Sequence, residues 1–298
     1  MKLLLSLRIV LISLPLLASI AWAGDEWSNT FGIQATHGNY AASSTRKTLT
    51  NEGAIFSTDY LDRWGATLGI NHTRIGNQDG SPNLGQDAVF ASGRYTFTPD
   101  RLPGQLLARM DIHTVDNNDT TRNSDSVTAF APQIGFLSFD KRHYVDLGHA
   151  KSTYKNDLSV SQWTPTVGFG FNDGSDWLQF RGWFITPSNS NRAQGKDSTR
   201  ALETKWTHWL TPNLLGIDNI KFTVIGGERI YSVDGEAGSI ANLADIHRGG
   251  ANLGAEWRVG RSANVQAIVG QDRFTNASTT IANDYRLNYG YLWLSNRW

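Results

Sequence analysis

The stretch WTPTVGFGFNDGSDWLQFRGWF, residues 163–184, contains two runs in which apolar side chains occupy every second position. Residues 163–171 alternate large apolar residues with Thr and Gly, and residues 178–184 alternate them with Gln179, Arg181 and Trp183. A period of two places successive side chains on opposite faces of a β-strand. The five residues that follow the first run, Asn172 to Asp176, are Asn, Asp, Gly and Ser, which favour turns. The stretch therefore predicts two strands joined by a short turn, each with one apolar face.

The same alternation recurs along the rest of the chain and indicates an all-β protein. Clear segments span residues 64–71, 89–97, 106–113, 202–210, 220–224, 251–259, 265–269 and 286–293. Weaker segments lie near Phe31, Phe56, Phe130 and Val145. We predict about fourteen strands. Twelve is the alternative if the segments near Phe31 and Val145 are not strands.

The connections between these segments alternate between two classes. The short class comprises Leu61 to Arg63, Thr98 to Gly104, Asp140 to Arg142, Asn172 to Asp176, Thr211 to Asp218 and Gly260 to Ser262. The long, polar class comprises Ile75 to Gln86, Asp116 to Asp125, Pro187 to Thr199, Ser232 to Asp245 and Thr275 to Asn283, with shorter members at Ala41 to Lys47 and Ser152 to Asp157. Alternating tight turns and long loops are typical of an up-and-down transmembrane antiparallel β-barrel. Both termini are then expected at the short-turn end.

Aromatic residues gather beside the short turns. The set is Trp27, Tyr60, Trp64, Phe97, Phe139, Phe171, Trp177, Trp206, Trp209, Trp257 and Trp298. Rings with an apolar body and a polar edge collect where a bilayer meets water. This distribution predicts an aromatic girdle at that rim. Packing in a protein core is the alternative explanation.

The first 23 residues predict a secretory signal peptide. Lys2 and Arg8 precede or flank a short apolar run from Ile9 to Ile20, and the segment ends on Ala21-Trp22-Ala23, a pattern that signal peptidase cleaves. Residues 24–298 then form a single barrel domain. No later stretch has the eighteen or so consecutive apolar residues of a transmembrane helix.

The charge balance and composition exclude several function classes. The 27 basic residues equal the 27 acidic ones, so nothing favours binding to nucleic acid. The absence of Cys excludes thiol nucleophiles, Cys-ligated metals and disulfides. The seven His residues show neither metal-ligand spacing nor a His-x-Ser pair. We predict no cofactor, no metal and no catalytic residue.

Function is expected on the lumen face, because the outer face of such a barrel needs only to be apolar. The charged residues of the predicted lumen are Arg94, Arg109, Asp111, Asp146, Arg181, Glu203, Lys205, Glu228, Glu256, Arg258 and Arg286, with Trp177, Trp183 and Trp209 on the same face. Charges of both signs orient hydrated polar solutes, and aromatic rings stack on sugars. The alternative is that these charges pair only to fill the lumen.

The whole of residues 24–298 resembles the bacterial outer-membrane β-barrel proteins. The resemblance rests on the signal peptide, the missing Cys, the alternating strands and a last strand, Tyr285 to Trp298, that ends on an aromatic residue. It implies that the barrel-insertion machinery recognises this strand through Trp298, Leu294 and Leu292, although Asn296 departs from the apolar pattern. Among such barrels the size is similar to that of the monomeric fourteen-stranded porins.

The resemblance implies a passive channel for small hydrophilic solutes in the outer membrane of a Gram-negative bacterium, surrounded by outer-membrane lipid. We expect the loops Pro187 to Thr199 and Ser232 to Asp245 to narrow its mouth. The first alternative is an export pore, for example for polysaccharide, that works with a periplasmic or inner-membrane complex and has a larger free lumen.

Two further alternatives depend on single groups of residues. A lipid-modifying enzyme would need His149 and Ser152, but residues three apart lie on opposite faces of a strand. Asp111, Asp116, Asp119 and Asp125 offer oxygen ligands for calcium, although an exposed, solvated loop explains the last three equally well.

Overall fold

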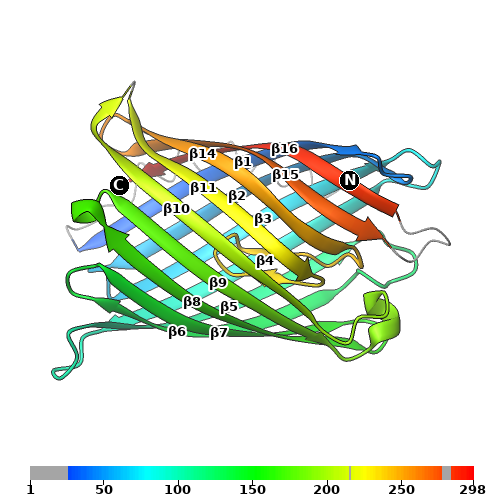
Figure 1. Cartoon of the computed structure of the whole chain (residues 1–298), viewed down its shortest axis with the longest axis horizontal. Helices are drawn as coiled ribbons and strands as arrows, with labels where there is room; N and C mark the ends of the chain where they lie inside the picture. The colour runs from blue at the N-terminus through cyan, green and yellow to red at the C-terminus, as the bar shows by residue number, and fades with distance from the viewer. Residues whose placement is uncertain (1–25, 215, 277–282) are drawn as a thin grey trace.

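The computed structural model describes residues 26–214, 216–276 and 283–298, and its strands close into one antiparallel barrel (Figure 1). The predicted signal peptide lies outside these residues. The barrel strands in the described ranges are β1 (Trp27–Ala41), β2 (Arg46–Tyr60), β3 (Trp64–Asn77), β4 (Leu84–Phe97), β5 (Gly104–Asn117), β6 (Val127–Ser138), β7 (His143–Tyr154), β8 (Leu158–Phe171), β9 (Asp176–Pro187), β10 (Thr199–Leu214), β11 (Ile217–Arg229), β14 (Ile246–Val259), β15 (Ala263–Asn276) and β16 (Asn283–Arg297). The prediction of a fourteen-stranded up-and-down barrel is confirmed.

The first and last strands close the barrel. β1 pairs with β16 in a register that runs from Thr30 opposite Arg297 to Ala41 opposite Arg286. The segments near Phe31 and Val145 are the strands β1 and β7, so the twelve-strand alternative is wrong. The described part of the chain contains no helix that is long and apolar enough to cross a membrane.

Short turns lie at one end of the barrel and longer loops at the other. The start of β1 and the end of β16 meet at the short-turn end, where Asn29 and Trp298 exchange two backbone hydrogen bonds of 2.9 and 3.0 Å. Two predicted connections are shorter than expected: β10 and β11 extend to Leu214 and from Ile217, and β3 and β4 extend to Asn77 and from Leu84. The pairing of β3 with β4 reaches Ile75 opposite Leu84, while that of β10 with β11 is irregular after Trp209 and ends with Leu214 opposite Ile217. Most of the predicted loop Thr275 to Asn283 lies outside the described residues.

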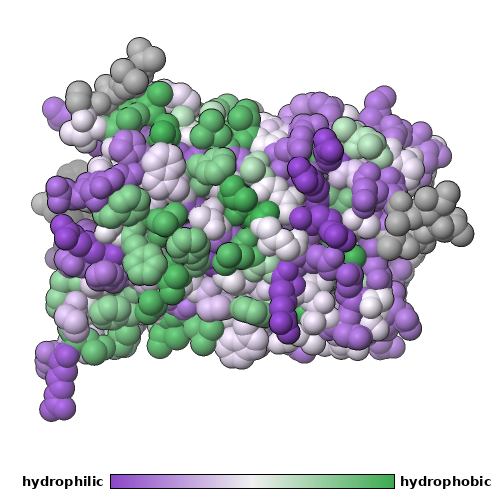
Figure 2. All heavy atoms as spheres, in the orientation of Figure 1, coloured by the Kyte–Doolittle hydropathy of each residue, from purple (hydrophilic) through white to green (hydrophobic). Residues whose placement is uncertain are grey.

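The outward face of the strands is apolar over much of their length. Leu68, Leu253 and Val269 are 54%, 54% and 64% exposed, although they are large and apolar. On the face shown in Figure 2, apolar side chains form a band toward the short-turn end, and hydrophilic side chains cover the long-loop end. The strands have 12 to 16 residues, which exceeds the roughly 9 to 11 that cross a hydrocarbon core. The barrel therefore extends beyond its apolar band at the long-loop end.

Aromatic rings pack in pairs at the short-turn end. Trp27 at the start of β1 lies 4.9 Å from Tyr60 at the end of β2, measured between ring centroids. Trp64 at the start of β3 lies 4.2 Å from Tyr95 on β4. These pairs occupy the rim at which the sequence predicts an aromatic girdle.

Candidate functional site: the lumen and its inserted loop

The connection between β11 and β14, residues 230–245, folds into the barrel and is called the inserted loop here. It contains a small hairpin, β12 (Val233–Asp234) and β13 (Ser239–Ile240), that is separate from the barrel sheet. The side-chain amide of Gln162 on β8 holds this hairpin. Its Nε2 donates to the carbonyl oxygen of Val233 at 2.7 Å, and its Oε1 accepts from the backbone nitrogen of Val233 at 2.9 Å. The buried Gln162 side chain thus pairs with the backbone of Val233 in the way that a residue of a neighbouring strand would.

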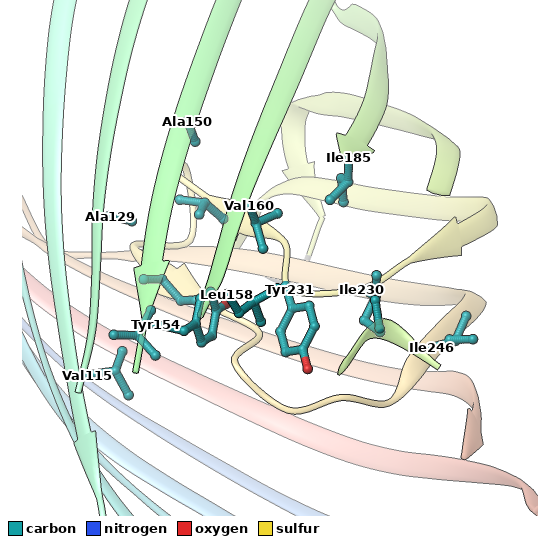
Figure 3. Close-up of a cluster of buried hydrophobic side chains, with 14 residues drawn as sticks. Val115, Ala129, Ala150, Tyr154, Leu158, Val160, Ile185, Ile230, Tyr231 and Ile246 are labelled. Atoms are coloured by element: carbon teal, nitrogen blue, oxygen red, sulfur yellow. The ribbon is translucent and has the colours of Figure 1, made fainter. Parts of the chain in front are cut away.

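An apolar cluster fixes the base of the inserted loop at the long-loop end (Figure 3). Tyr231 packs against Tyr154 on β7, with ring centroids 5.0 Å apart. The buried cluster joins residues of the five neighbouring strands β5 to β9, Ala193 of the β9–β10 connection and Ile246 of β14 to the loop. Its members are Val115, Val127, Ala129, Ala150, Tyr154, Leu158, Val160, Ile185, Ala193, Ile230, Tyr231, Val233, Ile240 and Ile246. Burial of these side chains provides the main apolar stabilisation of the loop inside the barrel.

The tip of the inserted loop is held by charges on the barrel wall. Glu236 accepts hydrogen bonds from Arg181 on β9 and from Lys205 on β10, the second at 2.6 Å between Nζ and Oε2. Arg181 also lies 3.7 Å from Asp234 and 3.9 Å from Glu203, measured to carboxylate oxygens. Arg181 and Glu203 have side chains only 7% and 6% exposed. Buried charges require partners of this kind, because an unpaired one is costly.

A second wall residue fixes the backbone of the tip. Arg109 on β5 donates to the carbonyl oxygen of Gly235 at 2.7 Å, while its Nε donates to Asp111 at 2.7 Å. A Cβ on Gly235 would lie 2.6 Å from Oδ2 of Asp111, so a side chain there would displace the Asp111 carboxylate. Gly238 has φ +59°, and a Cβ there would lie 3.0 Å from the ring of Phe90. We call Arg109, Asp111, Arg181, Glu203, Lys205, Asp234 and Glu236 the tip network.

At the mouth of the barrel, the inserted loop is tied to other connections. Arg46 on β2 donates to Asp245 and, at 2.8 Å, to the hydroxyl of Tyr285 on β16. The hydroxyl of Tyr231 donates to the carbonyl oxygen of Arg192 at 2.6 Å, which links the loop to the predicted mouth loop Pro187 to Thr199. That loop therefore lies at the mouth, whereas the loop Ser232 to Asp245 reaches into the lumen beneath it.

The structure brings six of the eleven predicted pore-lining residues to the tip of the inserted loop. Arg109, Asp111, Arg181, Glu203 and Lys205 belong to the tip network, and Asp146 lines a cavity together with Asp111, Arg181 and Glu236. Elsewhere in the lumen, Arg94 pairs with Asp59 and Glu256 pairs with Lys221 at 2.8 Å. Arg258 lies at the short-turn rim, 3.3 Å from Asp218, and is 60% exposed.

Two predicted lumen residues occupy other positions. Glu228 pairs with Lys196 at 2.7 Å and with Arg248 at 2.9 Å at the long-loop end, away from the tip network. Arg286 shares its face of β16 with the exposed, outward-facing Leu292 and Leu294, so its placement in the lumen is corrected to the outer face. The error arose because β16 carries large apolar or aromatic side chains on both faces, and the wrong set was assigned to lipid.

The alternative enzyme and calcium sites do not assemble as the sequence alternatives required. Nε2 of His149 lies 3.1 Å from the hydroxyl of Ser161 on β8, whereas Ser152 is buried on the other face of β7. Asp119 is used by its own loop, accepting from the backbone nitrogens of Thr121 and Ser124 at 2.9 and 3.1 Å. Among the described residues, no three or more His, Asp or Glu side chains are grouped to hold a metal ion.

Sequence reasoning missed Glu236 and Gln162, which hold the inserted loop from its two sides. Glu236 lies in a long polar connection that resembles the solvated loops around it, and Gln162 has the ordinary polarity of a lumen-facing strand position. Nothing in the local pattern distinguishes them, since their partners are distant in sequence.

We expect the inserted loop to be sensitive to acid, because ion pairs of the Glu236 carboxylate hold its tip. Glu236 lies outside the barrel strands. Burial by itself raises the pKa of Glu236, but Arg181 and Lys205 outweigh it and lower the pKa to about 2. An unfolded Glu has a pKa of about 4.3. The stabilisation of the folded protein by ionised Glu236 is therefore complete above that pH and is lost as the pH falls through 2. Because the Glu236 side chain is 43% exposed, water weakens the effect. We expect conductance to stay constant from pH 7 to 5 and to rise only below about pH 4.

Single-channel recording across this pH range tests the expectation, with Glu236→Gln as the control. That variant cannot lose a charge at position 236, so the acid-induced rise should be smaller than in the wild type. An equal rise in both proteins would assign the effect to other groups.

No protein-family model and no curated protein sequence matches the chain significantly. Solved structures share its fold at low sequence identity. A bacterial polysaccharide outer membrane secretin has a TM-score of 0.56 at 10% identity, with 91% of this chain and 98% of that chain covered. The Pseudomonas putida toluene transporter TodX has a TM-score of 0.56 at 7% identity, with 94% and 91% covered. A Pseudomonas aeruginosa FadL homologue has a TM-score of 0.53 at 9% identity, with 92% and 90% covered. The chain therefore has the fold of the bacterial outer-membrane β-barrel proteins, as the resemblance in its sequence implied.

Proposed function

We propose that the protein is an outer-membrane channel for passive diffusion of small hydrophilic solutes, and that the inserted loop forms its constriction. The observation that carries the proposal is a pair of neighbouring cavities beside the loop. One cavity of about 380 Å³ at the long-loop end and another of about 310 Å³ deeper in the barrel share the lining residues Leu49, Thr73, Gln86, Ser239 and Ile240. Each is far larger than the roughly 10 to 15 Å³ that a single water needs. The two cavities thus lie in succession along the wall that the loop leaves free.

The proposed location is the outer membrane of a Gram-negative bacterium. The exposed apolar band supports insertion in lipid, since water-soluble proteins rarely expose so large an apolar surface. We propose further that the signal peptide is removed after Ala23 and that the insertion machinery recognises the last strand, which ends at Trp298. Sequencing the amino terminus of the mature protein should give Gly24 as its first residue.

The export alternative requires a larger free lumen than the barrel provides. The inserted loop crosses the lumen and contacts the wall through Gln162, Arg109 and Arg181. A bulky polymer would need the entire loop to leave. Small solutes need no such movement, so the passive channel is the preferred function, and the proposal includes no reaction.

Planar-bilayer recording of the refolded protein tests the proposal. We expect discrete single-channel openings and a preference for cations, because the tip network with Asp146 contains three basic and five acidic side chains. The reversal potential in a KCl gradient measures that preference. A shift in gel-electrophoretic migration after the sample is boiled confirms that the protein was a folded barrel. A folded sample without openings at any voltage would contradict the proposal.

A further inference from the structure

The 310 Å³ cavity beside the inserted loop is lined by uncharged residues throughout. We call it the neutral cavity. Its lining comprises Gln34, Thr36, Leu49, Asn51, Asn71, Thr73, Gln86, Ala88, Val115, Ala237, Ser239 and Ile240. Four primary amides and three hydroxyl groups thus face one space. The charges of the tip network lie on the other side of the same loop, where they are engaged with one another and with the loop.

Amide side chains suit a ligand whose groups both donate and accept hydrogen bonds. Each Asn or Gln carries two N–H donors and one carbonyl acceptor, whereas a carboxylate only accepts and an ammonium only donates. Two amides of the neutral cavity are held in place: Asn51 donates to the hydroxyl of Thr73 at 2.7 Å, and Gln34 accepts from the hydroxyl of Tyr291 at 3.3 Å. Such groups can replace their hydrogen bonds to water with hydrogen bonds to the hydroxyls of a solute, and both partners of the new bonds are uncharged.

Aromatic side chains on β16 border this wall. Tyr289, Tyr291 and Trp293 occupy successive inward-facing positions of β16, beside the strand that carries Gln34. The ring of Trp293 lies against Gly32, and the ring of Tyr289 lies against Gly270, since a Cβ at either glycine would overlap the ring. Their inward-facing positions place these aromatic side chains at the lumen surface next to Gln34 of the neutral cavity. Aromatic faces favour apolar C–H surfaces of the kind that saccharide rings expose.

We propose that the neutral cavity binds uncharged saccharides as they pass through the channel. This inference rests on the proposed channel function and adds a solute class to it. A charged sugar would have to give up water in a space that offers no counter-charge, which is costly. A neutral sugar loses water–hydroxyl hydrogen bonds and regains them from the amides. The cavity thereby discriminates by charge at a position separate from the tip network.

Three trisaccharides of similar size provide the test: maltotriose, which is neutral, trigalacturonate, which is anionic, and fully deacetylated chitotriose, which is cationic. Each is added to single channels in a bilayer, and the block of ion current is measured against concentration. We expect maltotriose to block most tightly. Weaker block by maltotriose than by either charged sugar, or equal block by all three, would overturn the inference while leaving the channel itself established. Absence of any channel would instead contradict the proposed function.

Variants assign the binding to the neutral cavity. In Asn71→Leu and Gln34→Leu, we expect the concentration of maltotriose for half-block to rise about fivefold, as expected for the loss of roughly one hydrogen bond. Asn264→Leu is the matched control, because Asn264 faces the lumen on β15 near the short-turn end and lies outside the cavity lining. It should leave the block unchanged. An equal loss in the control and the cavity variants would place binding elsewhere.

Discussion

Removing residues 233–240 is expected to raise the single-channel conductance severalfold. These residues form the hairpin β12–β13 with its tip, which crosses the lumen between the tip network and the neutral cavity. The backbone nitrogen of Ala241 donates to the carbonyl oxygen of Ser232 at 2.8 Å, so a two-glycine linker can join the cut ends without moving them. The barrel strands pair with one another rather than with this hairpin. The shortened protein should therefore keep its barrel and lose its constriction.

The control is a similar shortening of a loop outside the lumen. Replacing residues 79–82, which connect β3 and β4, with two glycines should leave the conductance close to that of the wild type. Both proteins are first checked for migration that changes on boiling. Unchanged conductance in a folded 233–240 deletion would show that the inserted loop does not restrict the channel.

Arg181→Gln is expected to destabilise the protein strongly and to increase its preference for cations. Arg181 lies within ion-pair distance of Glu203, Asp234 and Glu236, and its own side chain is only 7% exposed. Removing one partner of a buried ion pair costs about 3 to 5 kcal/mol, because the remaining charge stays buried without compensation. Loss of one positive charge also leaves the lumen wall more negative. The midpoint of unfolding in urea measures the first effect, and the reversal potential measures the second.

Arg258→Gln is the matched control for this substitution. It removes the same charge from a rim residue that is 60% exposed and pairs with Asp218 at 3.3 Å. An exposed pair contributes only about 0 to 1 kcal/mol, so its unfolding midpoint should move little. If the two variants lost the same stability, the buried ion pairs of the tip network would contribute no more than an exposed pair.

The barrel was predictable from sequence because a membrane barrel repeats a simple rule along every strand. Alternation at residues 163–171 and 178–184 gave two neighbouring strands, and the difference between short and long connections gave their up-and-down order. The ends of strands were less predictable. Polar residues around Ile75 and Thr211 resemble loop residues, but the strands extend past both. At Ile75 the barrel continues beyond its apolar band, and near Thr211 an irregular pairing of β10 with β11 runs on to Leu214 opposite Ile217.

The lumen was predictable only where one face of a strand is clearly polar. On β9 and β10 the alternation clearly assigns Arg181, Glu203 and Lys205 to the polar face, and Arg181 and Lys205 both lie within ion-pair distance of Glu203. On β16 both faces carry large apolar or aromatic groups, so parity does not identify the outside. The partner of Arg181, Glu236, is 55 residues away along the chain. Its role depends on where a long loop folds, which local periodicity does not determine.

The seam between β1 and β16 determines when the inserted loop must reach its position. The two strands lie at opposite ends of the described chain, so their pairing has the greatest sequence separation in the barrel and the largest loop-closure entropy. The inserted loop, by contrast, contacts strands such as β8, β9 and β10 that precede it along the chain. These contacts can form while the sheet is still open. Closure of the seam would then enclose a loop that is already docked, and later escape would require the cluster around Tyr231 and the tip network to dissociate within a finished wall.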